Sequence, residues 1–430
     1  MNPQHPPDSS RRRLLAALAG LPVGALLVAA DCNAVTTPPP GSTTSTTGTA
    51  TTATPATSTT ATSTTATPAT STTVATPVSW TQPMVDSGAD GLWVPDGWSA
   101  TVLARTGEKV ASTNYVWSAA PDGAASFADP GGVGWWVAIN HEASSRSGGG
   151  ASAIHLSEDG EVIAAHRIIG GSSYNCAVGA TPLGTWLSGE EVVRGRIWET
   201  NPTIANSGEL RPAMGVFAHE AAAVDEARKG IYMTEDQPDG RLYRFTPRSW
   251  PNLNAGTLEV AVVSGGTIGG TGSVAWAEVP DPSAATTDTR AQVAESTPYA
   301  GGEGIAFGHG KIFFSTKHDN TVWAYDPASS VMTIVYRAGA GAVLTGVDNL
   351  WWDDLSSTLL TAEDGGNMEL VALGLDGSAV PILRAEGHGG SEITGPTVSP
   401  NRRFMTLSSQ RGRKDSIGVT WLVEGPLPSV

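Results

Sequence analysis

The chain has 430 residues and a net charge of −16, and only 15% of its residues are charged. This balance argues against nucleic-acid binding, which requires a basic surface to neutralise phosphates. Glycine, with 51 residues, and tryptophan, with 14, are frequent, as expected of a protein with many strands and tight turns. The composition therefore favours an all-β, exported protein.

The N-terminus has the layout of an export signal. Three arginines at residues 11–13 precede an uncharged apolar stretch, residues 14–30, that is short for a membrane span. We expect residues 1–31 to be a twin-arginine signal peptide, a type that exports folded proteins. Cys32 stands where a lipidated cysteine would follow cleavage, although Asp31 departs from the small residue usual there. The protein is expected outside the cytoplasm, either attached to the cell surface through Cys32 or secreted.

Residues 32–78 are almost wholly Thr, Ala, Pro, Ser and Gly. Such a segment cannot bury a core and is expected to be a disordered, extended linker that acts as a tether. Residues 79–430 remain, which is enough for one large all-β domain.

A two-strand pattern recurs through this domain. In its clearest unit, Cys176 is followed by a Pro-Leu-Gly turn, the apolar residues 185–187 and the acidic pair Glu190 and Glu191. Units of this kind recur every 45 to 50 residues or so, apart from one longer gap that we interpret as an insertion, and short strands with such a period are typical of propeller blades. A polar residue is expected at the end of the second strand of each unit, and we call this residue the tip. The six tips are Glu142, Glu191, Asp236, His318, Asp364 and Arg411. The sequence thus predicts a six-bladed β-propeller.

Near the start of its first strand, each unit has a residue at an equivalent position, which we call the mark, and this residue can bind a metal. Blade geometry would place these marks in a ring at one mouth of the central channel, although a single acidic residue at a strand end is usually a solvated loop residue. Converged carboxylates repel one another unless cations lie among them, so the ring predicts a metal site. The marks are Cys176, Glu220, Glu303, Asp348 and Glu392, and the first unit offers nothing beyond Asp129.

Two further features bear on the fold and the chemistry. Residues 98–105 alternate like a strand and would complete the last blade, next to residues 417–423. Cys176 has no disulfide partner once Cys32 is assigned to processing, so it is either a buried inert thiol or a metal thiolate. Motifs for a serine-hydrolase elbow, a P-loop or a zincin helix are absent.

The long motifs resemble the PhoX-type alkaline phosphatase family. They read N-C-A-V-G-A-T-P-L-G-T-W-L-S-G-E-E, H-E-A-A-A-V-D, G-G-E-G-I-A-F, V-D-N-L and S-E-I-T-G-P, and the resemblance runs from about residue 94 to residue 412. It implies a twin-arginine-exported, six-bladed propeller that hydrolyses phosphate monoesters with Fe³⁺ and Ca²⁺. The small phosphorylated substrate would bind to a monomer.

The resemblance also implies roles for individual residues. Cys176 would be the thiolate that bridges the irons, and Glu303 would be a carboxylate ligand at the same catalytic cluster. The metal ligands would be Cys176, Glu191, Glu220, Glu303, Asp348, Glu363, Asp364 and Glu392. Hard carboxylates suit Ca²⁺ and Fe³⁺, and a thiolate adds a preference for iron.

Two departures from the family pattern concern phosphate binding. The family commonly has an arginine two residues before the glutamate of the E-G-I motif, where this chain has Gly301, and its Q-H-P-G segment is altered at Gln410. Arg411, Lys317 or Arg194 would have to replace the lost contact, and Arg411 would then take part in catalysis.

Two alternatives remain: a non-catalytic surface propeller with structural calcium, and another calcium-dependent propeller hydrolase such as a lactonase. A metal thiolate at Cys176 would favour the phosphatase, because calcium alone has no use for sulfur.

Overall fold

The computed structural model describes residues 80, 82–265 and 268–427, which belong to one compact unit, residues 73–430. The predicted signal peptide, the linker and Cys32 lie outside the described residues. Strands dominate, and the described helices are single 3₁₀ turns: η1 (Ser145–Ser147), η2 (Pro212–Met214) and η3 (Thr289–Ala291). Within the described part of the chain, no helix has the length and hydrophobicity to cross a bilayer.

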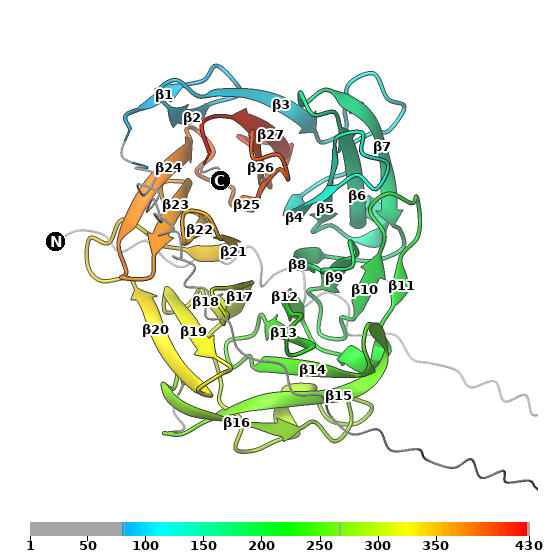
Figure 1. The fold of residues 1–430 in the computed structure, drawn as a ribbon, viewed down its shortest axis with the longest axis vertical. Coiled ribbons are helices and arrows are strands. Elements are labelled where there is room, and N and C mark those ends of the chain that lie inside the picture. Colours follow the sequence, from blue (N-terminus) through cyan, green and yellow to red (C-terminus); the bar gives the residue numbers. More distant parts are fainter. Residues whose placement is uncertain (1–79, 81, 266–267, 428–430) are drawn as a thin grey trace, which may run out of the picture. The chain divides into compact units, whose positions relative to one another are not determined.

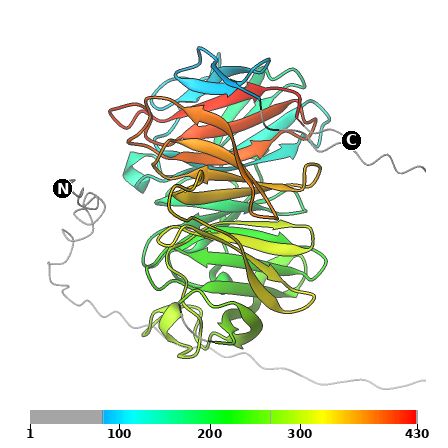
Figure 2. The same cartoon turned by 90° about the vertical axis from the view of Figure 1, so that its left-hand side faces the viewer.

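The strands form antiparallel sheets arranged around a common centre, which is an all-β propeller (Figure 1). In the side view the strands run across the short dimension of this unit (Figure 2). The first sheet is an up-and-down meander of β4 (Pro121–Ala128), β5 (Trp135–His141), β6 (Gly150–Leu156) and β7 (Val162–Ile169). The second is a meander of β8 (Asn175–Ala180), β9 (Trp186–Glu190), β10 (Ile197–Thr200) and β11 (Glu209–Leu210).

The longest sheet has nine strands and contains two four-stranded meanders. The first is β12 (His219–Asp225), β13 (Gly230–Glu235), β14 (Leu242–Ser249) and β15 (Asn252–Val263). The second is β17 (Gly302–Gly308), β18 (Lys311–Thr316), β19 (Thr321–Asp326) and β20 (Val331–Arg337). Strand β16 (Gly272–Glu278) joins the two, because it pairs with β15 along most of its length and with β20 at Gly272 and Ser273. The segment expected to be an insertion thus extends the outer edge of the sheet.

The N-terminal strands complete the two last sheets. β3 (Ser99–Arg105) pairs with β27 (Val419–Glu424), as predicted, and closes a sheet with β25 (Ile393–Val398) and β26 (Phe404–Ser409). The remaining sheet contains β21 (Val347–Asp353), β22 (Thr358–Glu363), β23 (Glu369–Gly374) and β24 (Ala379–Ala385). Its outer edge is extended by β1 (Met84–Asp86) and β2 (Leu92–Pro95). The pairing of β3 with β27 joins an N-terminal strand to the last strand of the ring.

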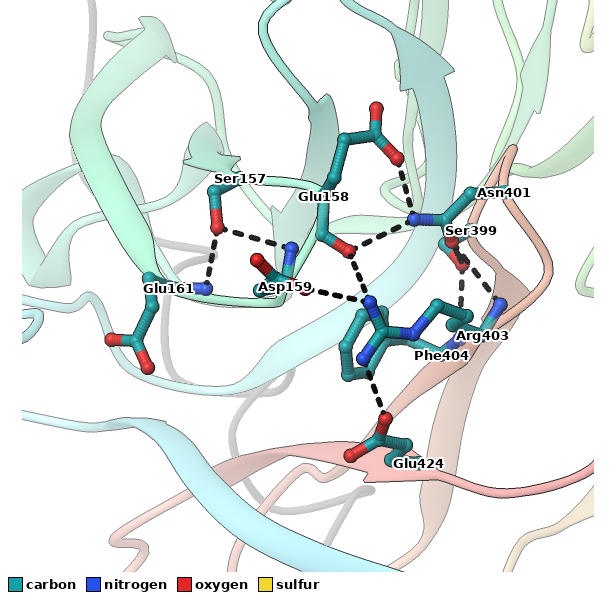
Figure 3. Close-up of polar contacts among 9 residues, drawn as sticks. All are labelled: Ser157, Glu158, Asp159, Glu161, Ser399, Asn401, Arg403, Phe404 and Glu424. Atoms are coloured by element: carbon teal, nitrogen blue, oxygen red, sulfur yellow. Dashed lines mark hydrogen bonds and ion pairs between the residues drawn. The ribbon is translucent and has the colours of Figure 1, made fainter.

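A polar cluster joins the first sheet to the last one (Figure 3). Arg403 donates to the carbonyl oxygen of Glu158 at 3.2 Å, to Asp159 Oδ1 at 2.7 Å and to Glu424 Oε1 at 2.9 Å. Asn401 Nδ2 donates to the carbonyl and carboxylate of Glu158. We call this group, Glu158, Asp159, Asn401, Arg403 and Glu424, the Arg403 clasp.

The hydrophobic core lies between neighbouring sheets, where large rings pack face to face. Trp135 stacks on Phe404 across the seam between the first and last sheets, with ring centroids 6.4 Å apart. Phe313 stacks on Trp352 at 5.3 Å between β18 and β21. Strands near the centre of the ring, such as β5, β12 and β13, are buried along their whole length, because neighbouring sheets cover both of their faces. This packing fixes the inner strand ends.

Candidate metal centre

Five inner strands share a bulge near their start, where two residues face a single residue of the partner strand. A bulge bends the strand and re-aims a side chain. In these five strands the first bulge residue can bind a metal: Asp122 in β4, Cys176 in β8, Glu220 in β12, Glu303 in β17 and Asp348 in β21. The second is small or short, and these residues line a narrow cavity at the centre of the ring. The bulge of the sixth inner strand, β25, is formed by Gly395 and Pro396. The repeated bulge therefore directs five ligand-type residues to one place.

Side chains opposite the bulges hold the ligand backbones in position across the sheets. Asn140 Nδ2 donates to the carbonyl oxygen of Cys176 at 2.6 Å. Thr234 Oγ1 donates to the carbonyl oxygen of Glu303 at 2.5 Å, and Ser315 Oγ donates to that of Asp348 at 2.6 Å. Each bond links the second strand of one meander to the first strand of the next. The positions of neighbouring ligands are therefore coupled.

A second ring of polar residues lies beside the first. We call the first bulge residues of the five strands the first ring. Each member of the second ring is the first residue after the second strand of a meander. Its N–H donates to a carbonyl oxygen, and in the five meanders with a first-ring residue this carbonyl belongs to the residue two positions before it. The members are Glu142, Glu191, Asp236, Lys317, Asp364 and Gln410. The predicted tips His318 and Arg411 are therefore wrong by one residue, since Lys317 and Gln410 occupy these positions.

The first and last repeats also differ from the predicted register. In the first, the ring residue is Asp122; Asp129 lies at the far end of β4, where it accepts from Trp136 Nε1 at 2.8 Å. In the last, the N–H of Gln410 donates to the carbonyl of Glu392, so Glu392 stands two residues before the equivalent position. Its carboxylate reaches the site from outside strand β25, beside Asp364, with which it forms an isolated bridge.

The two rings bring metal-binding side chains into four overlapping groups. Within each group, the ligand atoms lie within 4.8 Å of one another. The groups are Asp122, Glu142 and Cys176; Cys176, Glu191 and Glu220; Glu220, Glu303 and Asp348; and Asp348, Asp364 and Glu392. Because Cys176, Glu220 and Asp348 each belong to two groups, all nine residues form one connected cluster, which we call the thiol–carboxylate cluster.

Burial and mutual repulsion disfavour the charged forms in this cluster. Burial, together with Glu142 and Asp348, raises the pKa of Asp122 to about 8. Burial is also the largest cause that raises the pKa of the Cys176 thiol, with further contributions from Asp122 and Glu220. The same cause raises the pKa of the carboxyls Glu191, Glu220, Glu303 and Glu392. These groups can all be ionised together only if cations lie among them.

The surroundings of the Glu220 carboxylate show whether the cluster fits a metal ion. Glu220 is 1% exposed, and neither carboxylate oxygen has a hydrogen-bond partner among the described residues. A buried carboxylate without partners is costly, so such a group calls for a ligand. Carboxylate oxygens fit calcium and ferric iron, and the thiol at Cys176 adds a donor that iron accepts. The residues present therefore fit metal ions.

Most of the predicted metal ligands meet in this cluster, and one does not. Glu363 is buried at the end of β22, and its carboxylate accepts from the N–H groups of Thr345 and Glu369 at 3.0 Å each. It belongs to none of the four groups found among the described residues. The ligands that meet are Cys176, Glu191, Glu220, Glu303, Asp348, Asp364 and Glu392.

The predicted phosphate-binding residues lie in different surroundings. Arg411 Nη2 lies 2.9 Å from Glu392 Oε1, and its side chain is 33% exposed. Lys317 Nζ lies 2.7 Å from Asp236 Oδ2 and also contacts Glu303. Arg194 instead donates to the carbonyl oxygens of residues 283 and 284, each at 3.0 Å. Two of the three basic residues thus lie at the cluster, while Arg194 secures a loop.

The sequence interpretation missed Asp122 and the role of Gln410. Gln410 Nε2 donates to Asp122 Oδ2 at 2.5 Å and to Glu142 Oε2 at 2.7 Å, so it orients two members of the cluster. A signal for Asp122 was present, because a glycine follows it as small residues follow Cys176 and Glu220.

Comparison with solved structures finds other proteins of low identity. A gluconolactonase from Xanthomonas campestris has 11% identity and a TM-score of 0.49, over 80% of this chain and 97% of that one. A protein of unknown function from Bacteroides thetaiotaomicron has 11% identity and a TM-score of 0.47, over 76% of each chain. A putative gluconolactonase has 12% identity and a TM-score of 0.44, over 78% of this chain and 94% of that one. These likenesses are too weak to bear on chemistry.

A search among curated proteins found no match. A family model, described as alkaline phosphatase PhoX, matches residues 194–412, just over half of the chain. The matched segment contains Glu220, Glu303, Asp348, Asp364 and Glu392, while Cys176 precedes it. The chain belongs to the PhoX alkaline phosphatase family.

Proposed function

We propose that this protein hydrolyses phosphate monoesters at a metal centre built on the thiol–carboxylate cluster, with Fe³⁺ and Ca²⁺ as its cations. The observation that carries the proposal is Glu220, a buried carboxylate without partners at the junction of two ligand groups. The family membership supports the phosphatase activity. When bound, such cations neutralise the charge on the phosphate and help to orient it.

The protein supplies the shape and the donor set of the centre. Cys176 and Glu220 would bind between the second and third meanders, and Asp348 would connect this region to Glu392. The bonds that Asn140, Thr234 and Ser315 make to the ligand backbones keep these donors in fixed positions. Hydrogen-bonded supports of this kind commonly determine metal affinity. Glu363 and Arg194 are left out of the proposed site, because both serve local loops.

Arg411 is the best-placed residue for binding the substrate phosphate. Its side chain is one-third exposed, and its guanidinium lies against Glu392, at the edge of the cluster. Once a cation neutralises Glu392, the guanidinium can turn its paired N–H groups to phosphate oxygens, a bidentate contact that lysine cannot make.

The rest of the proposal concerns architecture and location. We propose six blades, counting the nine-stranded sheet as two, β12–β15 and β17–β20; the lining of the central cavity by residues from six strands supports this count. We further propose export by the twin-arginine route, with a linker that places the propeller outside the cell and with either lipidation at Cys32 or release. The unit is proposed to act as a monomer.

The test is a phosphatase assay on the purified full chain before and after metal removal. We expect hydrolysis of p-nitrophenyl phosphate, loss of that activity after prolonged chelation, and recovery when calcium and iron are returned together. Hydrolysis of a simple lactone, measured in parallel, should be negligible. A metal-bound protein that hydrolyses neither compound would instead support a binding propeller with structural calcium, and lactone turnover alone would favour the other hydrolase class.

A further inference from the structure

One position in the second ring carries the opposite charge to its neighbours. Four of the six second-ring residues are carboxylates and one is the amide Gln410, but the residue that follows β18 is Lys317. Its backbone is held as at the other positions, by an N–H bond to the carbonyl oxygen of Gly301 at 2.9 Å. Lys317 is therefore part of the ring and is not a surface residue that happens to reach it.

The Lys317 ammonium lies between two carboxylates. Its Nζ is 2.7 Å from Asp236 Oδ2 and contacts Glu303 Oε1, and the three side chains are only 18%, 11% and 4% exposed. Glu303 also belongs to a group that could hold a metal ion, whereas Asp236 belongs to none of the groups found among the described residues. An ammonium group offers three donors and no acceptor, so it can join two carboxylates as a small cation does.

Gly301, whose carbonyl oxygen accepts this N–H bond, leaves space for the lysine stem. A Cβ atom at Gly301 would lie 3.1 Å from Lys317 Cγ and 3.3 Å from the His318 ring, which is tighter than ordinary contacts. A large side chain at residue 301 would therefore compete with Lys317 for space. The glycine at this position and the lysine at the ring fit together as a pair.

We infer that the Lys317 ammonium is a permanent counter-cation of the ring, which joins Asp236 to Glu303 where a divalent cation would otherwise lie. The inference rests on the proposed metal centre but not on its phosphatase activity. Unlike a bound ion, the ammonium cannot be removed by a chelator. The ring should therefore bind one ion fewer than it would with a carboxylate at residue 317.

The direct test is the calcium stoichiometry of a Lys317→Glu variant. The parent and the variant are chelated, equilibrated with calcium and then measured by elemental analysis and by equilibrium calcium binding. We expect about one additional calcium ion in the variant, since it then offers three carboxylates together. Lys317→Arg, which keeps the cation, should match the parent.

Lys311 provides a matched control at the other end of β18. Its Nζ pairs with Asp326 Oδ2 at 2.9 Å, and its side chain is 33% exposed. Lys311→Glu therefore changes the net charge by the same amount as Lys317→Glu, but at a place away from the ring. This control should bind calcium as the parent does. Equal calcium content in Lys317→Glu and the parent would overturn the inference, whereas a parent that binds no metal at all would instead refute the proposed metal centre.

A second measurement on the parent protein covers the case in which Lys317→Glu does not fold. Amine labelling followed by mass spectrometry reports whether Lys317 is paired inside the ring. We expect Lys317 to remain protected both with calcium and after chelation, while Lys311 is labelled in both states. Labelling of Lys317 that rises on calcium loading would show that metal ions displace the ammonium, and the inference would fail.

Discussion

The thiol–carboxylate cluster and the Arg403 clasp both gather acidic residues from distant parts of the chain, yet their electrostatics are opposite. In the clasp, Asp159 and Glu424 are 80% and 48% exposed, and Arg403 pairs with both of them (Figure 3). In the cluster, Glu220 is 1% exposed and has no hydrogen-bond partner among the described residues. The exposed carboxylates of the clasp are neutralised by Arg403 and hydrated by water. A buried carboxylate without partners, such as Glu220, needs a cation from outside the chain. A carboxylate of this kind therefore indicates a metal site more specifically than an acidic residue alone does.

The largest expected effect comes from removing a charge at the centre of the cluster. Glu220→Gln should lower phosphomonoesterase activity by at least about 100-fold and reduce bound metal, because Glu220 belongs to two ligand groups. The control is Glu259→Gln, which breaks a pair with Arg244 on the outer strands β14 and β15 and should leave activity unchanged. Activity near that of the parent in Glu220→Gln would remove this residue from the site.

The second effect is a pH dependence that should differ between metal-free and metal-loaded protein. The pKa of Asp122 is raised from 3.8 to about 8 in the metal-free fold, so folding favours its protonated form. Its stabilising contribution is complete below about pH 4 and is lost as pH rises toward 8. Denaturation midpoints of chelated protein should therefore fall across this range, and those of metal-loaded protein should not. A chelated protein that becomes more stable with rising pH would contradict this account of the cluster.

A smaller effect is expected from the arginine beside Glu392. Arg411→Ala should raise KM for a phosphomonoester about tenfold, and Arg411→Lys should raise it less, because lysine keeps the charge but loses the paired donors. A fall in kcat would show that the contact strengthens in the transition state. Steady-state kinetics of both variants provide the measurement, and unchanged constants in both would assign Arg411 to a structural pair with Glu392.

The space beside Lys317 can be tested with two alanine substitutions. Gly301 and Gly310 share a φ of +72°, so alanine meets the same backbone strain at both, but a Cβ at Gly310 has no neighbour within 4 Å. We expect Gly301→Ala to cost about 1 kcal/mol more of unfolding free energy than Gly310→Ala, since it crowds Lys317. Denaturant unfolding of the two variants measures the difference. Equal losses would show that Lys317 moves aside at no cost.

The smallest effect is expected at the clasp. Arg403→Ala removes an exposed ion-pair network, so it should change the midpoint of thermal unfolding by about 2 °C or less. Phosphatase activity and metal content should stay at parental values. A loss of bound metal in this variant would show that the seam between the first and last sheets controls the cluster. It would contradict the expectation that the clasp and the cluster are independent.

The sequence was informative where ligands follow the local pattern of the strand. Cys176, Glu220 and Glu303 each begin a bulge and are followed by a small residue, so their spacing predicts a shared ring. Glu392 was predicted at an equivalent position, but the hydrogen bond from Gln410 places it two residues earlier, and only the pairing of β25 with β26 reveals that shift.

The directions of long side chains were not predictable from spacing. Arg194 was a reasonable candidate for phosphate binding, because it lies only three residues after Glu191. Its guanidinium instead bonds to the carbonyls of residues 283 and 284, about ninety residues further along the chain. Such contacts depend on how a distant loop folds back, which leaves no periodic trace in the sequence.

Elemental analysis of the parent and of Glu220→Gln, both purified without chelator, shows whether the thiol–carboxylate cluster holds the metal ions needed for phosphatase activity. We expect iron and calcium in fixed proportion in the active parent, and clearly less of both metals in the variant, with the β-sheet circular dichroism spectrum retained. A parent that hydrolyses phosphomonoesters without bound iron or calcium, or a variant with parental metal content, would contradict this expectation.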